Sequence, residues 1–264
     1  MVNNKMLIHL HIAKTGGESL NHVINNNYSK ELTYNVYLTE DRIINDKLKE
    51  ISLTKPQPQC VQGHFPFGIH EYFNQPFMYV TLLRNPIDRL ISEYYFIHSF
   101  SWPPWLDKNN SMHHQLLNFS LEEYIKYPAN RNKQTRLISG NSHSEKMKLL
   151  ENAKQNIQKY FVVAGITEMF AESFFLMKEK LGWRNIDYRK TNVTKIRPRI
   201  HELSSGIIKL IEDNNEIDIK FYNFVKEKLM NQIEELNTED KVKLNSFLKD
   251  NNSNSKGVYP DCNG

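Results

Sequence analysis

The sequence predicts an α/β fold, a single domain in which a central, mainly parallel sheet is flanked by helices. Three short apolar runs, at residues 6–11, 78–83 and 160–164, have the length of buried strands, and helical patterns lie between them. Alternating strands and helices are typical of such a sheet. No linker rich in glycine or serine and no internal repeat is present, so we expect one domain over residues 1–249. Residues 250–264, rich in Asn and Ser, are predicted to form a flexible tail.

A glycine turn follows the first predicted strand. The sequence there reads Lys14-Thr15-Gly16-Gly17-Glu18-Ser19, and a helix is predicted over residues 19–27. Glycine lets the backbone approach a ligand closely. The free N–H groups and the dipole of the following helix point at the same spot, which makes an anion site beside Lys14. An ordinary strand–turn–helix unit with a solvated lysine would show the same pattern.

The position of this lysine disfavours the commonest phosphate-binding loops. A Walker A loop needs Gly-x-x-x-x-Gly-Lys followed by Ser or Thr, so that the lysine comes after the glycines. Here Lys14 precedes them, and neither Gly-Lys-Ser/Thr nor a Gly-x-Gly-x-x-Gly dinucleotide turn occurs in the chain. An ordinary P-loop ATPase or kinase is therefore not expected.

The second predicted strand leads into another helix start, Arg84-Asn85-Pro86-Ile87-Asp88-Arg89-Leu90-Ile91-Ser92. Asn85 is a good N-cap, and Pro86 suits the first helical position. Arg84 can bind a phosphate through two parallel hydrogen bonds, and Ser92 can add a hydroxyl donor. The alternative is a surface Arg–Asp pair. Two such sites in one chain predict a ligand with two separated phosphate-like groups.

Taken together, the two motifs resemble those of the PAPS-dependent sulfotransferases, in particular the carbohydrate group that includes the heparan sulfate 2-O- and 6-O-sulfotransferases. The resemblance covers roughly residues 6–225, although Glu18 stands where a Thr or Ser is common. Four further segments are similar to family landmarks in the same order: Gln62-Gly63-His64-Phe65-Pro66-Phe67-Gly68, Asn132-Lys133-Gln134-Thr135-Arg136, Gly165-Ile166-Thr167-Glu168 and Asn192-Val193-Thr194-Lys195.

This resemblance implies a set of cofactor-binding residues for PAPS. A P-loop-like loop, formed by Lys14, Thr15, Gly16, Gly17, Glu18 and Ser19, would hold the 5′-phosphosulfate. Arg84 and Ser92 would bind the 3′-phosphate, and Thr167 would also contact the cofactor. Arg136 and Gln134 are expected to touch the cofactor or the acceptor. The scheme needs no metal.

The resemblance also implies two catalytic residues. His64 matches the family's general base, since a neutral imidazole accepts a proton near pH 7. Lys14 would stabilise the charge that grows on the leaving group. Among the ten histidines, His11 is a second candidate because it lies close to the glycine loop, whereas His113 and His114 are expected in a polar loop.

The acceptor is expected to carry a hydroxyl, on a glycan or a glycolipid. Residues 101–145 read as a loop-rich insertion that forms one wall of the acceptor cleft, with Trp102-Pro103-Pro104-Trp105 as a candidate sugar-stacking loop. A net charge of +4 without a recognised motif disfavours nucleic acid as a partner. No apolar run approaches ~18 residues, so no transmembrane segment is expected. Residues 1–5 lead directly into the first strand, which predicts a cytoplasmic enzyme or a chain trimmed at its N-terminus.

Two other functions stay open at this point. A kinase-like phosphotransferase would need a metal-binding carboxylate after a strand and a Walker lysine, and neither is found in the sequence. A non-catalytic nucleotide-binding protein would keep the pocket without turnover. The presence of both His64 and Lys14 disfavours that reading.

Overall fold

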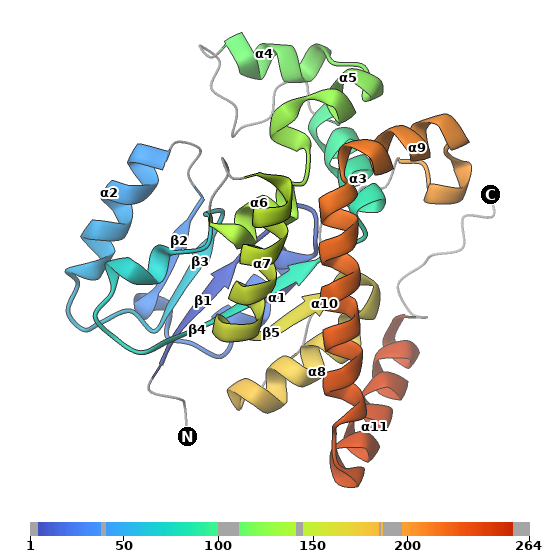
Figure 1. Ribbon diagram of the computed structural model, residues 1–264. Coiled ribbons are helices and arrows are strands. Elements are labelled where there is room, and N and C mark those ends of the chain that lie inside the picture. Colours follow the sequence, from blue (N-terminus) through green and yellow to red (C-terminus); the bar gives the residue numbers. More distant parts are fainter. Residues whose placement is uncertain are drawn as a thin grey trace, which may run out of the picture.

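The computed structural model describes residues 5–37, 41–99, 111–140, 145–184, 186 and 197–255 (Figure 1). Its centre is a five-stranded sheet in the order β2-β3-β1-β4-β5, and every neighbouring pair of strands is parallel. The predicted α/β fold is confirmed. The strands are β1 (Met6–Leu10), β2 (Thr33–Val36), β3 (Cys60–Gly63), β4 (Phe77–Leu83) and β5 (Phe161–Ile166).

The three strands predicted from apolar runs are confirmed as β1, β4 and β5, within two residues at each end. The sequence analysis missed β2 and β3, which are four residues each and carry polar side chains. β3 is buried along its whole length because it lies between β1 and β2. Its burial therefore comes from its place in the sheet rather than from its own composition.

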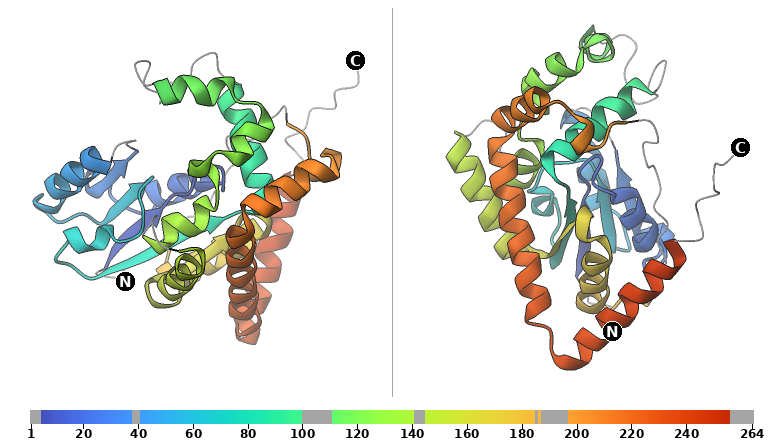
Figure 2. Two further views of the ribbon diagram at one scale, coloured as in Figure 1. Left: turned by 45° about the horizontal axis from the view of Figure 1, so that its top comes forward. Right: turned by 90° about the vertical axis from the view of Figure 1, so that its right-hand side faces the viewer.

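Helices cover both faces of the sheet, as a parallel sheet requires. Figure 2 shows α1 on one side and α6, α7 and α10 on the other. The helices are α1 (Gly17–Asn25), α2 (Asp41–Ser52), α3 (Pro86–His98), α4 (Ser111–Asn118), α5 (Leu121–Lys126), α6 (Lys133–Ser139), α7 (Lys146–Tyr160), α8 (Phe170–Leu181), α9 (Ser205–Asn214), α10 (Glu216–Glu234) and α11 (Thr238–Ser255). Within these described parts, no helix combines the length and the apolar character that crossing a bilayer requires.

The expectation of a loop-rich insertion at residues 101–145 is wrong where the structure describes that segment. It holds α4, α5 and α6, and α5 begins with a capping box in which Ser120 and Glu123 bond reciprocally. His113 and His114 fall within α4 rather than in a loop. The proposed sugar-stacking loop 102–105 and the family segment 192–195 lie outside the described residues.

Above the sheet in Figure 1, the helices α3, α5 and α9 form a small second core. It is built from buried apolar side chains: Leu90, Ile91, Tyr124, Ile125 and Ile211. This core holds α3 over the carboxyl ends of the strands. At the other end of the chain, α11 continues through residues 250–255 of the predicted tail, and residues 256–264 lie outside the description.

Candidate active site at the carboxyl ends of the strands

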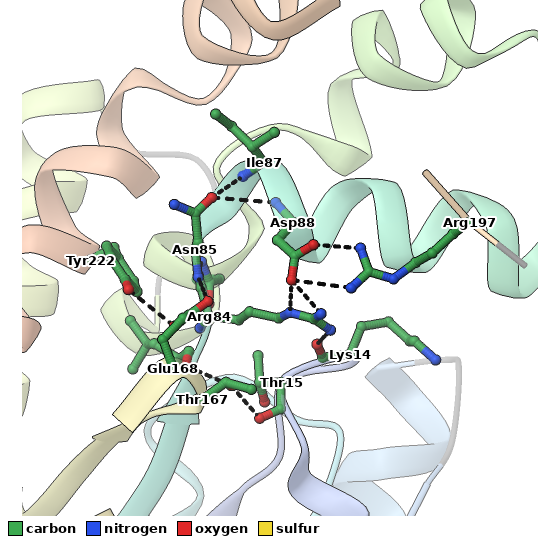
Figure 3. Close-up of polar contacts among 12 residues, drawn as sticks. Lys14, Thr15, Arg84, Asn85, Ile87, Asp88, Thr167, Glu168, Arg197 and Tyr222 are labelled. Atoms are coloured by element: carbon green, nitrogen blue, oxygen red, sulfur yellow. Dashed lines mark hydrogen bonds and ion pairs between the residues drawn. The ribbon is translucent and has the colours of Figure 1, made fainter. Parts of the chain in front are cut away.

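Four strands end at one edge of the sheet, and each is followed closely by a residue predicted for the site. Lys14 comes after β1, His64 after β3, Arg84 after β4 and Thr167 after β5. Because all the strands are parallel, these residues converge at the edge where ligands bind in open α/β sheets. Figure 3 shows Lys14, Arg84 and Thr167 gathered there.

The glycine loop has the geometry of an anion site. Gly16 is the N-cap of α1 with φ 86°, a left-handed conformation that favours glycine, and among the described residues no side chain caps this helix. The first N–H groups of α1 therefore face the loop without a capping side chain. A Cβ on Gly17 would lie 2.0 Å from the ring of His11, so only glycine fits at this position.

Lys14 is held in an unusual backbone conformation. Its φ is 67°, which costs energy for a residue with a Cβ and is found mainly where surrounding structure enforces it. Here Arg84 Nη1 donates to the Lys14 carbonyl at 3.0 Å. The two predicted anion motifs, 70 residues apart in the sequence, are thus bonded to each other.

The ammonium of Lys14 lies in a largely apolar, positively charged setting. Its Nζ is 3.6 Å from the centre of the Phe96 ring, a cation–π contact. Burial and the positive charge of Arg84 lower the pKa of Lys14 to about 8, against the opposing effect of Glu93. The side chain therefore keeps its proton at pH 7 but yields it more readily than an exposed lysine.

Arg84 belongs to a charged cluster rather than to a simple surface pair. Its Nε donates to Asp88 Oδ2 at 2.7 Å, and Nη2 binds the same oxygen. Asp88 also bonds to Arg197, which lies 109 positions further along the chain. Burial alone raises the pKa of Asp88, but the two arginines hold it below its usual value. Both side chains of the Arg84–Asp88 pair are mostly buried, at 16% and 19% exposed. Because two arginines share one carboxylate, the cluster carries a surplus positive charge.

His64 is oriented by the main chain. Its Nδ1 lies 2.7 Å from the carbonyl oxygen of His11, and a carbonyl can only accept, so Nδ1 carries the hydrogen. Nε2 of the neutral ring is then an acceptor. Burial lowers the pKa of His64 below 6.5, while this hydrogen bond opposes the shift. The ring of Tyr37 lies edge-on to the His64 ring, with 4.8 Å between the two ring centres.

His9 and His11 are buried side chains with partners inside the protein. His9 Nδ1 lies 2.8 Å from Asn21 Oδ1, and His11 Nδ1 lies 3.0 Å from the Tyr37 hydroxyl. Burial lowers the pKa of His9 to about 3 and that of His11 well below 6.5, so both rings are neutral. His11 is only 4% exposed, which favours His64 as the histidine that meets a substrate.

Three other predicted residues turn out to hold the backbone of the site. The hydroxyl of Thr167 lies 2.6 Å from the Thr15 carbonyl and 2.9 Å from that of Leu83, which joins the glycine loop to the end of β4. Gln134 accepts from Arg84 N at 3.0 Å and donates to Arg84 O at 2.9 Å. Arg136 donates to the carbonyl groups of residues 128, 129 and 131.

The expected contacts of Gln134 and Arg136 with a ligand stay a prediction, and in the structure both side chains also bind main-chain atoms. Of the remaining predicted residues, Ser92 lies on the buried face of α3, at 2% exposed. Glu18 is half exposed, with its carboxylate 3.9 Å from His11. Glu168, next to Thr167, accepts from the N–H of Asn85 at 2.9 Å and so supports the start of α3.

A second charged group was not predicted. Glu93, on α3, accepts from Arg89 at 2.8 Å and from Lys133 at 2.7 Å. Burial alone raises the pKa of Glu93, but these two cations bring it down to about 2. The i,i+4 spacing could have suggested the Arg89–Glu93 pair, whereas the contact of Glu93 with Lys133 joins residues 40 positions apart. Among the described residues, no group of three His, Cys, Asp or Glu side chains is arranged to hold a metal ion.

Comparison with known proteins agrees with this geometry. The family described as "Sulfotransferase family" matches residues 1–225. Human heparan-sulfate 6-O-sulfotransferase 2 is 26% identical over 203 residues, which cover 66% of this chain and 33% of the human protein. The chain thus spans about a third of the length of that curated relative.

Two solved structures are similar at lower levels of identity. The mouse sulfotransferase SULT7A1 complexed with PAP shares 12% identity, with a TM-score of 0.38 over 94% of this chain and 84% of that one. Retinol dehydratase in complex with retinol and PAP shares 10% identity, with a TM-score of 0.36 over 98% and 85% of the two chains.

Proposed function

Because the chain belongs to the sulfotransferase family, we propose that it transfers a sulfuryl group from PAPS to a hydroxyl of a carbohydrate acceptor. The observation that carries this proposal is the junction of the two anion motifs, in which Arg84 Nη1 donates to the Lys14 carbonyl at 3.0 Å. It joins a glycine loop and an arginine cluster into one site for a ligand with two anionic ends.

The donor would lie across both halves of the site. The N–H groups at the start of α1, from Thr15 to Ser19, would hold its 5′-phosphosulfate, since among the described residues no side chain caps this helix. Arg84, held in place by Asp88, would bind the 3′-phosphate, with Ser92 on the same helix. The surplus positive charge of the Arg84–Asp88–Arg197 cluster suits this group.

The transfer itself needs one base and one cation. Nε2 of His64 would take the proton of the acceptor hydroxyl as its oxygen forms a bond to sulfur. The bond between sulfur and the bridging oxygen breaks, and the electron pair leaves on the 5′-phosphate. Lys14, protonated at pH 7 because its pKa is about 8, would stabilise that charge.

A carbohydrate acceptor is supported by the human relative, whose name places its activity on heparan sulfate. The acceptor would be a glycan or a glycolipid, and the side chains that face it are not assigned by this likeness. A cytoplasmic location stays a prediction from the sequence.

Calorimetry with adenosine 3′,5′-bisphosphate, and with ATP as the comparison, tests the proposal. We expect the bisphosphate to bind with a Kd on the order of micromolar and much more tightly than ATP. Arg84→Ala should weaken it at least about tenfold, since a hydrogen-bonded charge is removed from the site. Arg184→Ala, an exposed arginine beyond α8, is the matched control and should bind as the wild type does. Equal or tighter binding of ATP would contradict the proposal.

A further inference from the structure

Lys133 occupies a position that the local sequence does not favour. It is the first residue of α6, where a cation opposes the helix dipole, and no acidic residue is present in that first turn. The preceding Asn132 has φ 48°, a left-handed conformation. Such departures from local preference are expected where a side chain is held for function.

The tertiary structure enforces this start of α6. Asn132 Oδ1 accepts from the N–H groups of Ile217 and Asp218, each at 3.0 Å. In return, the Asp218 carboxylate accepts from Gln134 N at 3.1 Å and from Thr135 N at 2.7 Å. The first turn of α6 is therefore bonded to the start of α10 on both sides of Lys133.

The ammonium of Lys133 is held in place by an ion pair with Glu93. Nζ lies 2.7 Å from Glu93 Oε1, and the other oxygen of Glu93 is bound by Arg89 at 2.8 Å. The carboxylate is almost fully buried, whereas the side chain of Lys133 is 30% exposed. The buried carboxylate of Asp218 also acts on Arg89, so two cations face two carboxylates and Lys133 is the partly exposed member of the group. An ammonium carries three N–H donors, and among the described residues Lys133 Nζ uses one of them on Glu93.

This charge lies beside the residues proposed to carry out the transfer. Gln134, the next residue, bonds to both backbone groups of Arg84, so the first turn of α6 touches the end of β4. The charge of Lys133 lowers the pKa of His64, and that of Glu93 raises it. Glu93 also raises the pKa of Lys14. Phe96, whose ring centre lies 3.6 Å from Lys14 Nζ, follows Glu93 by three residues on α3, so Lys133 and Lys14 meet the same side of that helix.

We propose that Lys133 is a further catalytic residue, whose ammonium, held by Glu93, donates a hydrogen bond to the acceptor oxygen as that oxygen attacks sulfur. The inference rests on the proposed function. In the step, the hydroxyl proton goes to His64 Nε2, the new O–S bond forms, and Lys133 keeps its own proton. The ammonium stabilises the negative charge that the oxygen carries while its proton leaves.

Three variants test this role by kinetics: Lys133→Met, Lys133→Arg and, as a control, Lys126→Met on the exposed face of α5. Lys133→Met should lower kcat by about 100- to 1,000-fold, the order expected when a donor to a reacting oxygen is lost. Its affinity for adenosine 3′,5′-bisphosphate should stay within about twofold, because that ligand lacks the reacting oxygen. Lys133→Arg should recover part of the rate, and Lys126→Met should behave as the wild type.

A pH titration of the His64 ring by NMR, in the bisphosphate complex, separates this role from a purely structural one. The rings of Tyr37 and the buried His11 lie against His64, and the charges of Lys133 and Glu93 act on the pKa of His64 in opposite directions. Removing the lysine charge leaves Glu93 less compensated, so the pKa of His64 should rise in Lys133→Met and stay in Lys133→Arg.

Unchanged kcat, or an unmoved His64 titration in Lys133→Met, would overturn the assignment. A wild-type protein that binds the bisphosphate but transfers no sulfuryl group would contradict the proposed function instead. The titration still reports the position of Lys133 in that case, because it requires no turnover.

Discussion

At the scale of single residues, the orientation of His64 explains how this site can hold a base without a carboxylate partner. The hydrogen of Nδ1 is bound by the carbonyl of His11 at 2.7 Å, which fixes both the tautomer and the direction of the ring. Burial keeps its pKa below 6.5, so the neutral form prevails at pH 7. His64 is therefore ready to accept a proton through Nε2.

His64→Ala should abolish most of the sulfuryl transfer and leave donor binding intact. General-base catalysis contributes on the order of 10²- to 10⁴-fold, and we expect a loss of kcat within that range. Binding of adenosine 3′,5′-bisphosphate by calorimetry should match the wild type, since the loop and the Arg84 cluster are untouched. His22→Ala, on the exposed face of α1, is the control. Wild-type rates in His64→Ala would remove its role as base.

At the scale of elements, the first turn of α6 acts as a clamp on the end of β4. Gln134 is fully buried and bonds reciprocally to the N–H and the carbonyl of Arg84. A strand that ends at Leu83 leaves these two groups without a ladder partner, and buried backbone groups need one. The contact with Gln134 therefore fixes the backbone position from which the Arg84 side chain extends into the site.

Gln134→Leu should destabilise the protein and weaken donor binding together. Two buried backbone groups would lose their partners, at about 1–3 kcal/mol each, so we expect the free energy of unfolding to fall by roughly 2–4 kcal/mol. The affinity for adenosine 3′,5′-bisphosphate should drop several-fold as Arg84 shifts. Urea unfolding and calorimetry measure the two effects, with Gln155→Leu on the exposed face of α7 as control. Full stability in Gln134→Leu would contradict the clamp.

At the scale of the whole molecule, the buried histidines behind the site make the fold sensitive to acid. Burial lowers the pKa of His9 to about 3, and His11 is shifted in the same direction. As the pH falls, a histidine of the unfolded chain binds a proton near pH 6.5, whereas His9 of the folded chain binds one only near pH 3. Stability should therefore fall as the pH drops below 6.5 and continue to fall toward pH 3.

For His9 alone, the loss at pH 5 is about 2 kcal/mol relative to neutral pH. Urea unfolding between pH 7 and pH 5 tests this, because Glu93, with a pKa of about 2, stays ionised in the folded protein over that range. His9→Gln should show a flatter dependence on pH than the wild type, and His22→Gln should not. An equal slope in His9→Gln would mean that other groups drive the acid response.

Much of the fold, and the motifs that the structure brings together at one edge of the sheet, follow from the sequence. Apolar runs located β1, β4 and β5, and glycine and capping patterns located the starts of α1 and α3. These signals are local, because a strand or a helix start is specified by residues close together in the chain. β2 and β3 escaped prediction because their burial depends on neighbouring strands.

The partners of the charged groups at the site were decided by tertiary structure alone. The pairing of Asp88 with Arg197 joins residues 109 positions apart, and the contact of Glu93 with Lys133 joins residues 40 apart. Likewise, the main-chain groups that Gln134 and Arg136 bind could not be read from their motif. Motifs report which chemistry a chain carries, whereas the partners of each charge depend on how the strands and helices are brought together, which no short stretch of sequence encodes.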